Sequence, residues 1–345
     1  MSARAFITDV AGTVLSDRER AFLRESEPWG LILFKRNINT PEQVRRLTDS
    51  FRDAVGRADA PVLVDQEGGR VQRLGPPHWP AYPAGSDYGR LYDRDPQAGL
   101  AAAWLGARLI ATDLAAVGID VDCWPLADVP IAGADAVIGG RAFGTEPDKV
   151  AALAGAVAEG LREGGVLPVV KHIPGHGRAL ADSHHELPAV SAGRASLEAT
   201  DFRAFQLLSH LPLAMTAHVV FTAIDPVTPA TTSVTIVREV IRGLIGFDGM
   251  LMTDDISMRA LTGDMRARSR ASLAAGCDVV LHCNGRFDEQ CAVAEAVPVL
   301  EGAAARRAAA ALAWHKRGPE IDVAEARRRF ATMMAPVRAD EAVRS

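Results

Sequence analysis

The sequence has few of the features that mark disulfide-stabilised or exported proteins. Its four cysteines include no C-x-x-C pair, and two lie in apolar runs where cysteine usually behaves as a small hydrophobic residue. They are Cys123, Cys277, Cys283 and Cys291. The first residues, MSARAFITDVAGTVL, lack an apolar segment of signal-peptide length. We therefore expect a protein of the reducing cytoplasm.

Long apolar runs and an excess of one charge are also missing. No window of about 18 uninterrupted apolar residues occurs, so no membrane span is expected. The chain carries 38 Lys and Arg against 43 Asp and Glu, a net charge of −5, and the two signs are interspersed. This balance argues against a nucleic acid or an anionic membrane surface as partner. No internal repeat or low-complexity block is present.

What the sequence has is a regular alternation of short apolar runs with longer helical segments. Eight runs are typical of strands, and most are apolar throughout, as expected for strands that are covered on both faces. These runs are residues 5–8, 30–34, 61–64, 119–124, 166–170, 213–216, 249–252 and 277–281. Alternating strands and helices predict a parallel sheet with right-handed crossovers.

Helix signals fill the spaces between these strands. Thr40, Pro41 and Gln43 form the start of a helix, with a capping residue, a proline at the first position and a glutamine at the third. Further helices are expected at 99–117, 147–163, 196–209 and 233–244, and residues 286–335 also have a helical composition. Eight strand–helix units predict a single (β/α)8 barrel. We expect it to span residues 1–335, with a flexible tail over 336–345.

One long connection interrupts this regularity. Residues 76–96, after the third strand, are rich in Pro and Gly and show no helical period. In a chain this compact, such a loop is expected to form the rim of a site.

Polar residues gather directly after the predicted strands, where (β/α)8 barrels carry their active sites. Asp65 follows the third strand, Lys171 and His172 follow the fifth, His218 follows the sixth and Asp254 follows the seventh. A single case of this kind is usually a solvated loop charge or a helix cap. Four coincident cases favour a functional site.

Asp254 is the sharpest of these positions. The stretch GMLMTDDISM leads an apolar strand into two adjacent carboxylates, and neighbouring side chains on a strand point to opposite sides. Only one of them can face the barrel axis. We assign that place to Asp254 and expect Asp255 to cap a helix that begins near Ser257.

The segment KHIPGHGRALADSHHELP, residues 171–188, is unusually rich in titratable groups. Asp182 and His184 are two residues apart, so the carboxylate can hold the imidazole and raise its pKa, which suits a general acid/base. Gly175 and Gly177 should give the segment freedom at its base, and Pro188 closes it, as in a flap over bound substrate. Such a flap would bring the dyad over the site.

Clustered histidines could also form a metal site. The barrel metallohydrolases need His-x-His at the end of the first strand, and AFITDVAG contains none, so we expect no metal.

Arg73, Arg141 and Lys171 add fixed positive donors, and Asp65 adds a carboxylate. Charged side chains with few aromatic partners suit the recognition of sugar hydroxyl groups by paired hydrogen bonds. A phosphate site built from the same cations stays open, although the carboxylates of Asp65 and Asp254 would repel a phosphate.

These residues fall within motifs that resemble those of glycoside hydrolase family 3, and specifically of its single-domain bacterial β-N-acetylglucosaminidases. The resemblance covers residues 5–285. Its motifs are VDQEGGRVQRL (64–74), IGGRAFG (138–144), KHIPGHG and DSHHELP (171–188), TAHV (216–219) and GFDGMLMTDDISM (246–258), with DVAGTVL and GLILFKRNI near the start. Ile173 stands where Phe is usual, and Gly140 stands where a charged residue often precedes the Arg.

The resemblance implies a role for each residue in a retaining mechanism that needs no cofactor. Asp254 would be the nucleophile, and His184, assisted by Asp182, would be the acid/base. The N-acetylglucosamine unit would be bound by Asp65, Arg73, Arg141, Lys171 and His172. Larger members of the family carry the acid/base on an additional domain, so a flap dyad is consistent with this shorter chain.

The resemblance also implies a substrate. It suggests a cytoplasmic monomer that removes N-acetylglucosamine from muropeptide fragments bearing anhydro-N-acetylmuramic acid. Alternatives are a glycosidase or glycoside phosphorylase of the same family with another sugar or acceptor, a metal-dependent amidohydrolase and an inactive sugar-binding protein.

Overall fold

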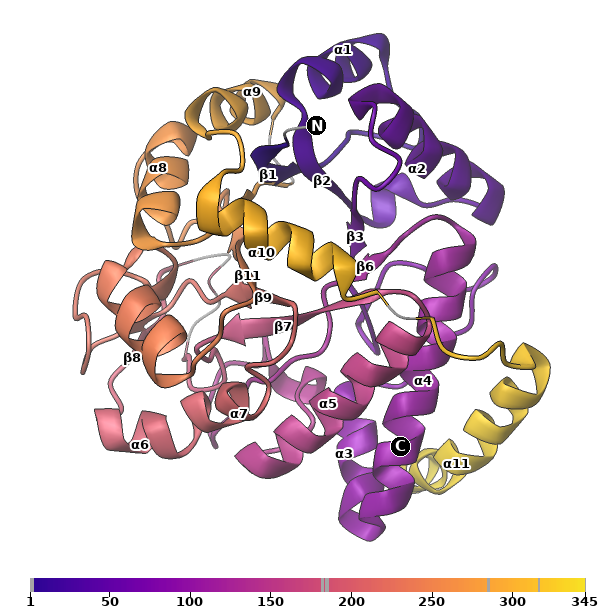
Figure 1. Ribbon diagram of the computed structural model, residues 1–345. Helices are drawn as coiled ribbons and strands as arrows, with labels where there is room; N and C mark the ends of the chain where they lie inside the picture. The colour runs from indigo at the N-terminus through magenta and orange to yellow at the C-terminus, as the bar shows by residue number, and fades with distance from the viewer. Residues whose placement is uncertain (1–2, 181–182, 184–185, 284–285, 316, 345) are drawn as a thin grey trace.

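Eight parallel strands close into a barrel in the computed structural model, which describes residues 3–180, 183, 186–283, 286–315 and 317–344 (Figure 1). Around the barrel the strands follow the order β1-β12-β11-β9-β7-β6-β3-β2. They are β1 (Arg4–Thr8), β2 (Pro28–Leu33), β3 (Val62–Val64), β6 (Val121–Asp122), β7 (Leu167–Ile173), β9 (Leu213–Thr216), β11 (Met250–Asp255) and β12 (Val279–Leu281). Ile7 of β1 pairs with both Leu281 of β12 and Gly30 of β2, which closes the ring.

Helices follow the strands and form the outer layer of the barrel (Figure 1). They are α1 (Asp17–Ser26), α2 (Pro41–Val55), α3 (Gly85–Arg94), α4 (Pro96–Ala116), α5 (Pro147–Glu163), α6 (Arg194–Ala199), α7 (Asp201–Leu207), the π-helix η4 (Ile236–Leu244), α8 (Met265–Ala275), α9 (Phe287–Ala296), α10 (Gly302–Ala313) and α11 (Val323–Arg344). The shorter elements are β4 (Gln66–Gly68), β5 (Val71–Gln72), β8 (Ala189–Val190), β10 (Val220–Phe221) and the 3-10 turns η1 (Lys35–Asn37), η2 (Gly139–Arg141) and η3 (Ala230–Thr232). The predicted fold class and all eight predicted strands are confirmed.

Helix α2 begins and ends as its sequence indicates. The Thr40 hydroxyl accepts a hydrogen bond from the Gln43 N–H at 3.3 Å, and Pro41 occupies the first turn. Gly56 ends the helix with a φ of 64°, a left-handed conformation that glycine adopts without strain. The cap signals therefore locate this element correctly.

Two sequence-based expectations about helices are wrong. Residues 76–96 are not free of helix, because α3 occupies 85–94 and buries Tyr88 and Leu91. The helix predicted over 196–209 is divided at Thr200 into α6 and α7. In the first case the burial of one face against neighbouring helices outweighs a composition rich in Gly and Pro.

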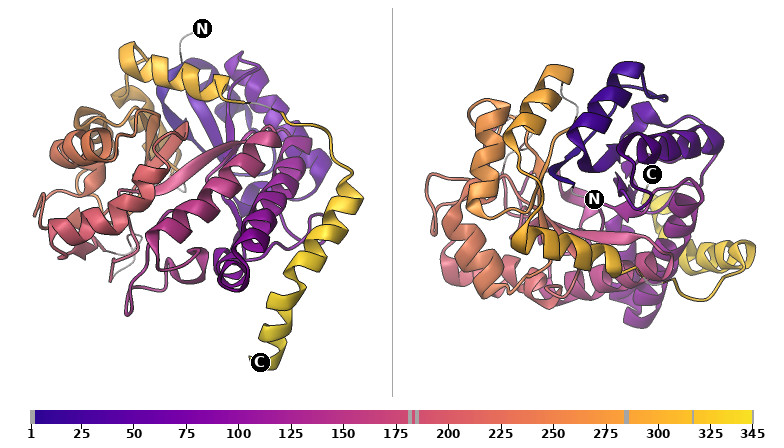
Figure 2. Two further views of the ribbon diagram at one scale, coloured as in Figure 1. Left: turned by 60° about the horizontal axis from the view of Figure 1, so that its bottom comes forward. Right: turned by 45° about the horizontal axis from the view of Figure 1, so that its top comes forward.

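The barrel interior is filled at one end and open at the other. Apolar side chains of the strands, such as Leu63, Val169 and Met252, form one cluster with Trp29 at the start of β2 and with Ala308 of α10. Helix α10 therefore covers the end at which the strands begin (Figure 1; Figure 2). The carboxyl ends of the strands lie at the opposite end, which is where the polar motifs of the sequence were expected to meet.

Helix α4 is long and apolar enough, by length and composition, to cross a membrane. Of its most apolar window 61% is buried inside the protein, and the helix contacts α3, α5 and α11. This burial is typical of a core helix, whose apolar side chains pack against neighbouring helices.

The C-terminal helix α11 packs on α3 and α4 and continues to Arg344, with Pro336 inside it. It crosses the boundary at residue 336 that the sequence suggested. The flexibility of residues 336–345 stays a prediction.

Candidate active site

A cavity of about 440 Å³ lies at the carboxyl ends of the strands. Phe34 after β2, Met215 in β9 and Cys283 after β12 contribute to its wall. It is also lined by the six described residues that the sequence analysis selected as nucleophile or sugar ligands, namely Asp65, Arg73, Arg141, Lys171, His172 and Asp254. Residues from distant parts of the chain are therefore brought together as the barrel geometry requires.

A network of buried charges forms one wall of this cavity. Lys171 Nζ, whose side chain is 2% exposed, lies 2.8 Å from Asp65 Oδ1 and 2.7 Å from Glu67 Oε1. Arg73 donates to Asp65 Oδ2 at 3.0 Å, and Arg141 donates to both Glu67 oxygens at 2.8 and 2.7 Å. Each buried charge thus has a partner of opposite sign, as buried charges require.

These contacts favour the ionised forms of Asp65, Glu67 and Lys171. Burial by itself raises the pKa of the Asp65 and Glu67 carboxyls, but Lys171 and the neighbouring guanidinium groups lower both below their usual range. Burial lowers the pKa of Lys171, but Asp65 and Glu67 raise it above its ordinary value. This wall of the cavity therefore consists of ion pairs whose charged groups have fixed orientations.

Glu67 was not among the residues selected from the sequence. It lies two residues beyond Asp65 in the same motif, DQEGG, on the short strand β4. Alternation along an extended segment places Asp65 and Glu67 on one side, which is the signal that could have identified it.

Asp254 lies at the end of β11 and points into the cavity, where Asp255 N donates to its Oδ1 at 2.8 Å. Burial raises the pKa of the Asp254 carboxyl, but His172, His218 and the Asp255 amide together lower it below its usual value. The side chain is therefore an ionised carboxylate in a mostly desolvated place, as a carboxylate nucleophile requires.

Asp255 has a different role, although it also touches the cavity. Its Oδ1 accepts from the N–H groups of Ser257 at 2.9 Å and Cys283 at 3.2 Å, and its Oδ2 accepts from the Ser257 hydroxyl at 2.6 Å. The prediction that it caps a helix near Ser257 is wrong. Tight turns follow β11, and α8 begins later, capped by Asp264.

His218 lies behind Asp254 and does not line the cavity. Its Nε2 lies 3.0 Å from the Asp255 carbonyl oxygen, and its Nδ1 lies 2.7 Å from the Thr231 hydroxyl. Burial lowers the pKa of His218, which favours the neutral imidazole. Since a carbonyl oxygen only accepts, Nε2 carries the proton. His218 therefore supports the backbone beside Asp254.

His172 is held from behind by Asp128. The Asp128 Oδ2 lies 2.8 Å from His172 Nδ1, and Oδ1 accepts from the backbone N–H of His172 at 3.3 Å and of His176 at 2.6 Å. A carboxylate at Nδ1 places the ring proton there and leaves Nε2 for the cavity. Asp128 is fully buried and was also missed from the sequence, since it lies four residues beyond an apolar run rather than directly after it.

Asp182 and His184 lie outside the described residues, so their predicted acid/base role stays a prediction. Nearby, Ser183 Oγ lies 3.7 Å from Met258 Sδ, and Met258 lines the cavity. Ser183 thus contacts a residue of the cavity wall.

The base of this segment is packed against its surroundings, and the freedom expected from its glycines stays a prediction. Residues 171–177 are buried, and a Cβ on Gly177 would lie 2.3 Å from backbone atoms of Val129. Gly177 thus permits close packing against a neighbouring loop.

Known proteins are similar to this chain over most of its length. Residues 9–311 match the model of the glycosyl hydrolase family 3 N-terminal domain. The chain belongs to glycoside hydrolase family 3. A β-hexosaminidase of Alkalilimnicola ehrlichii is 43% identical over 277 residues, which cover 79% of this chain and 78% of the relative. A β-hexosaminidase of Pseudomonas aeruginosa is 40% identical over 84% of this chain and 85% of the relative.

Two solved structures have a fold similar to that of this chain. The crystal structure of NagZ from Neisseria gonorrhoeae in complex with N-trifluoroacetyl-D-glucosamine has a TM-score of 0.84 and 32% identity, covering 98% of both chains. A family 3 β-N-acetylglucosaminidase of Paenibacillus has a TM-score of 0.85 and 27% identity, covering 96% of this chain and 67% of that chain. The predicted enzyme class, a glycoside hydrolase of the β-N-acetylhexosaminidase group, is confirmed.

No group of three or more His, Cys, Asp or Glu side chains suited to a metal ion occurs among the described residues. Three of the titratable groups in the segment 171–188 lie outside them, so the absence of a metal site stays a prediction.

Proposed function

We propose that the protein is a retaining exo-β-N-acetylglucosaminidase that releases terminal N-acetylglucosamine from cell-wall muropeptides. The observation that carries this proposal is the ionised carboxylate of Asp254, which shares a cavity with the paired charges of Asp65, Arg73, Lys171 and Arg141.

The network suits the recognition of one terminal sugar. Its carboxylates can accept hydrogen bonds from hydroxyl groups while its cations donate to the hydroxyl oxygens, and Nε2 of His172 adds a further polar atom. Because the charges already neutralise one another, a neutral ligand fits better than a phosphate, which would meet Asp65 and Asp254.

In the proposed first step the Asp254 carboxylate attacks the anomeric carbon, and the bond to the leaving group breaks as His184 protonates its oxygen. In the second step His184, oriented by Asp182, takes a proton from water, and the hydroxide displaces Asp254 from the sugar. The two inversions cancel, so the β configuration is retained. The acid/base assignment is supported by the sequence motif.

The substrate and setting are supported by the family. The relatives include β-hexosaminidases and an enzyme solved with an N-acylated glucosamine, so an N-acetylated sugar is the proposed unit. We propose that the leaving group is an anhydro-N-acetylmuramic acid peptide and that the enzyme acts as a cytoplasmic monomer in cell-wall recycling.

A comparison of two aryl glycosides tests this proposal. The aryl N-acetyl-β-glucosaminide should be hydrolysed and the matching β-glucoside much more slowly, and proton NMR should show the β anomer of the sugar first. Release of the α anomer would contradict the retaining mechanism. Loss of activity on chelation would favour a metal-dependent amidohydrolase, and a sugar 1-phosphate formed in phosphate buffer would reveal a phosphorylase.

Variants test the two catalytic roles separately. Asp254→Ala should lose nearly all turnover whatever the leaving group, and a 2-fluoro sugar should leave a covalent adduct on Asp254 in the unaltered enzyme. His184→Ala should lose about 10²–10⁴-fold with a natural leaving group and much less with an activated aryl group that needs no protonation. Equal losses with both leaving groups would contradict the assignment of His184.

A further inference from the structure

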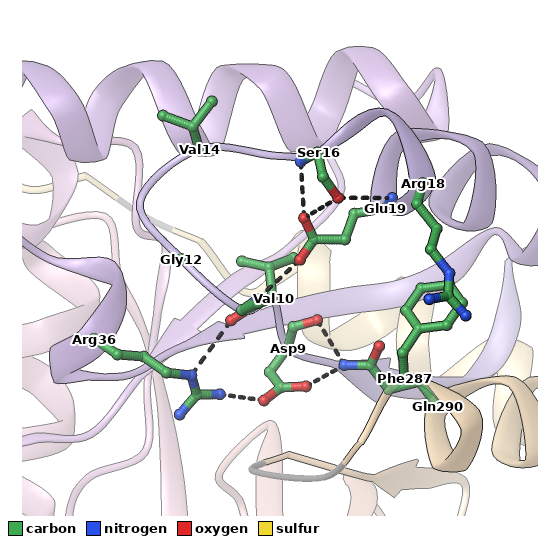
Figure 3. Close-up of a pocket in the computed structure, with 11 residues that line it drawn as sticks. Asp9, Val10, Gly12, Val14, Ser16, Arg18, Glu19, Arg36, Phe287 and Gln290 are labelled. Atoms are coloured by element: carbon green, nitrogen blue, oxygen red, sulfur yellow. Dashed lines mark hydrogen bonds and ion pairs between the residues drawn. The ribbon is translucent and has the colours of Figure 1, made fainter.

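A second cavity, of about 670 Å³, lies beside the active site at the carboxyl end of β1 (Figure 3). It is formed by the loop that follows β1, by the start of α1 and by Phe287 and Gln290 of α9. Strand β1 pairs with β2 and β12, and the residues just after those two strands line the active-site cavity. The two cavities are thus neighbours on the same end of the barrel.

Phe34 links the two cavities. Its side chain lines the active-site cavity, and the guanidinium carbon of Arg73, a residue of that cavity, lies 5.4 Å from the centre of its ring. The guanidinium carbon of Arg36, which lines the second cavity, lies 4.9 Å from the same ring. Phe34 therefore lies between a residue of the active-site cavity and a residue of the second cavity.

The acidic groups of the second cavity are already satisfied. Glu19 accepts hydrogen bonds from Ala11 N and Ser16 N, both at 2.8 Å, and from the Ser16 hydroxyl at 2.6 Å. The Asp9 carboxylate accepts hydrogen bonds from Arg36 and from the Gln290 side chain (Figure 3). Neither carboxylate is left to attract a cation.

Arg18 differs from these residues. Its guanidinium carbon lies 3.8 Å from the centre of the Phe287 ring, and no carboxylate among the described residues pairs with it (Figure 3). Stacking on an aromatic face orients a guanidinium and leaves the donors at its edge exposed, in a fork that matches a carboxylate. Among the described residues, the second cavity therefore carries one oriented guanidinium that has no carboxylate partner.

We propose that the second cavity binds a carboxylate-bearing extension of the leaving group, with Arg18 as its anion donor. The inference rests on the proposed function and deepens it, because it assigns the acidic part of the substrate to a place in the fold. Val14, which is 68% exposed at the rim, would contact apolar parts of such an extension, and Gln290 would offer a polar side chain deeper in the cavity.

The test compares three substrates: a neutral aryl N-acetyl-β-glucosaminide, an N-acetylglucosaminyl disaccharide carrying a short acidic peptide, and the same disaccharide with its peptide carboxylates amidated. Arg18→Gln should reduce kcat/KM for the acidic substrate about tenfold, mainly through KM, because one charge-assisted contact is lost. The amidated and aryl substrates should change little. Arg24→Gln is the matched control, since it removes the same charge from an exposed position of α1 that does not line the cavity.

A second variant tests the cavity and keeps its charge. A Cβ on Gly12 would meet nothing within 4 Å, so Gly12→Phe can place a ring in the cavity without a clash at its base. It should raise KM for both peptide-bearing substrates and leave the aryl substrate unaffected. An equal effect of Arg18→Gln and Arg24→Gln on the acidic substrate, or no effect of Gly12→Phe, would overturn the inference. Failure to hydrolyse the aryl substrate would instead overturn the proposed function.

Discussion

At the scale of single residues, the site depends on pairs in which one side chain faces the cavity and another fixes it from behind. Lys171 is held by Asp65 and Glu67, Arg141 by Glu67, and His172 by Asp128. Side chains held in this way cannot rearrange freely when the substrate arrives. The cost of ordering them has been met during folding, which favours binding that is specific for one sugar.

Asp128→Asn tests the support of His172. The amide oxygen can still accept the backbone N–H groups of His172 and His176, but the amide N–H₂ cannot accept the ring proton at Nδ1 if it replaces Oδ2 there. We expect KM for the aryl N-acetylglucosaminide to rise about tenfold or more, in line with one hydrogen bond to a charged group, and kcat to change less.

Asp278→Asn is the control for Asp128→Asn. Asp278 is also buried and is bound by Arg242, but it does not line the active-site cavity. It should lower the urea midpoint and leave KM unchanged. Equal KM values for wild type and Asp128→Asn would show that Asp128 has only a structural role.

At this scale much of the site could be predicted. Position directly after a buried strand selected Asp65, Lys171, His172 and Asp254, because the barrel brings all strand ends together. Glu67 and Asp128 were missed because neither residue directly follows a barrel strand in the sequence. Their importance follows from contacts with residues 104 and 44 positions away, by difference of residue number, which position after a strand does not reveal.

At the scale of elements, helix α3 lies in the loop after the third barrel strand and packs against the backbone of Arg141, which lines the active-site cavity. Its first residue, Gly85, lies so close to Arg141 that a Cβ there would be 2.0 Å from the Arg141 carbonyl oxygen. One turn later a Cβ on Gly89 would lie 1.9 Å from the Phe143 carbonyl oxygen. The two glycines thus allow α3 to pack directly on the backbone that positions Arg141.

Gly85→Ala should therefore displace the backbone at Arg141. We expect KM for the aryl N-acetylglucosaminide to rise severalfold and the free energy of unfolding to fall by about 1–3 kcal/mol, as for other overpacked sites. Gly193→Ala is the control, since a Cβ at Gly193 meets nothing within 4 Å. An unchanged KM for Gly85→Ala would mean that Arg141 does not depend on α3.

Helices with explicit caps were predictable, whereas α3 was not. Thr40 and Pro41 mark the start of α2 because the cap satisfies backbone groups within the same turn. Helix α3 begins after Ala84, which provides no side-chain cap, and is held by the packing of Tyr88 and Leu91 and by the close approach of its glycines to residues 141–143. Apart from one local hydrogen bond, from the Ala84 N–H to the Asp87 carboxylate, tertiary contacts stabilise this segment as a helix.

At the scale of the whole molecule, the buried charges couple the site to global stability. Removing one partner of a buried ion pair leaves the other charge uncompensated, which typically costs about 3–5 kcal/mol. Glu67 has two such partners, Lys171 and Arg141, on different strand–helix units. Its loss should therefore weaken the closed barrel as well as the site.

Glu67→Gln should lower the free energy of unfolding by about 3–5 kcal/mol at pH 7, measured in urea. The pKa of Glu67 is lowered in the folded state, so its stabilisation is present above the unfolded pKa near 4.3 and is lost as pH falls through the folded value. The difference between variant and wild type should therefore shrink below about pH 4.

The pH dependence of Glu67→Gln must be compared with that of the wild type, because other buried carboxyls change the pH dependence of stability in the opposite direction. Burial raises the pKa of Asp120 and Asp122, so the wild-type pH dependence alone does not isolate Glu67. Glu295→Gln, which removes an exposed partner of Arg266, should leave the urea midpoint nearly unchanged, because exposed ion pairs contribute little to stability. A difference for Glu67→Gln that stays constant from pH 7 to pH 3 would contradict an ionised Glu67 in the folded protein.

The sequence alone determined the alternation of strands and helices, hence the barrel, and the residues that stand at its strand ends. These are local properties, because hydrophobic period, caps and strand ends are set within a few neighbouring residues. The tertiary structure decided which charge neutralises which, and it left Arg18, beside a second cavity next to the site, without a carboxylate partner in the part of the chain that the structure describes. Such pairings depend on distances between residues far apart in the chain, and those distances exist only once the barrel has closed.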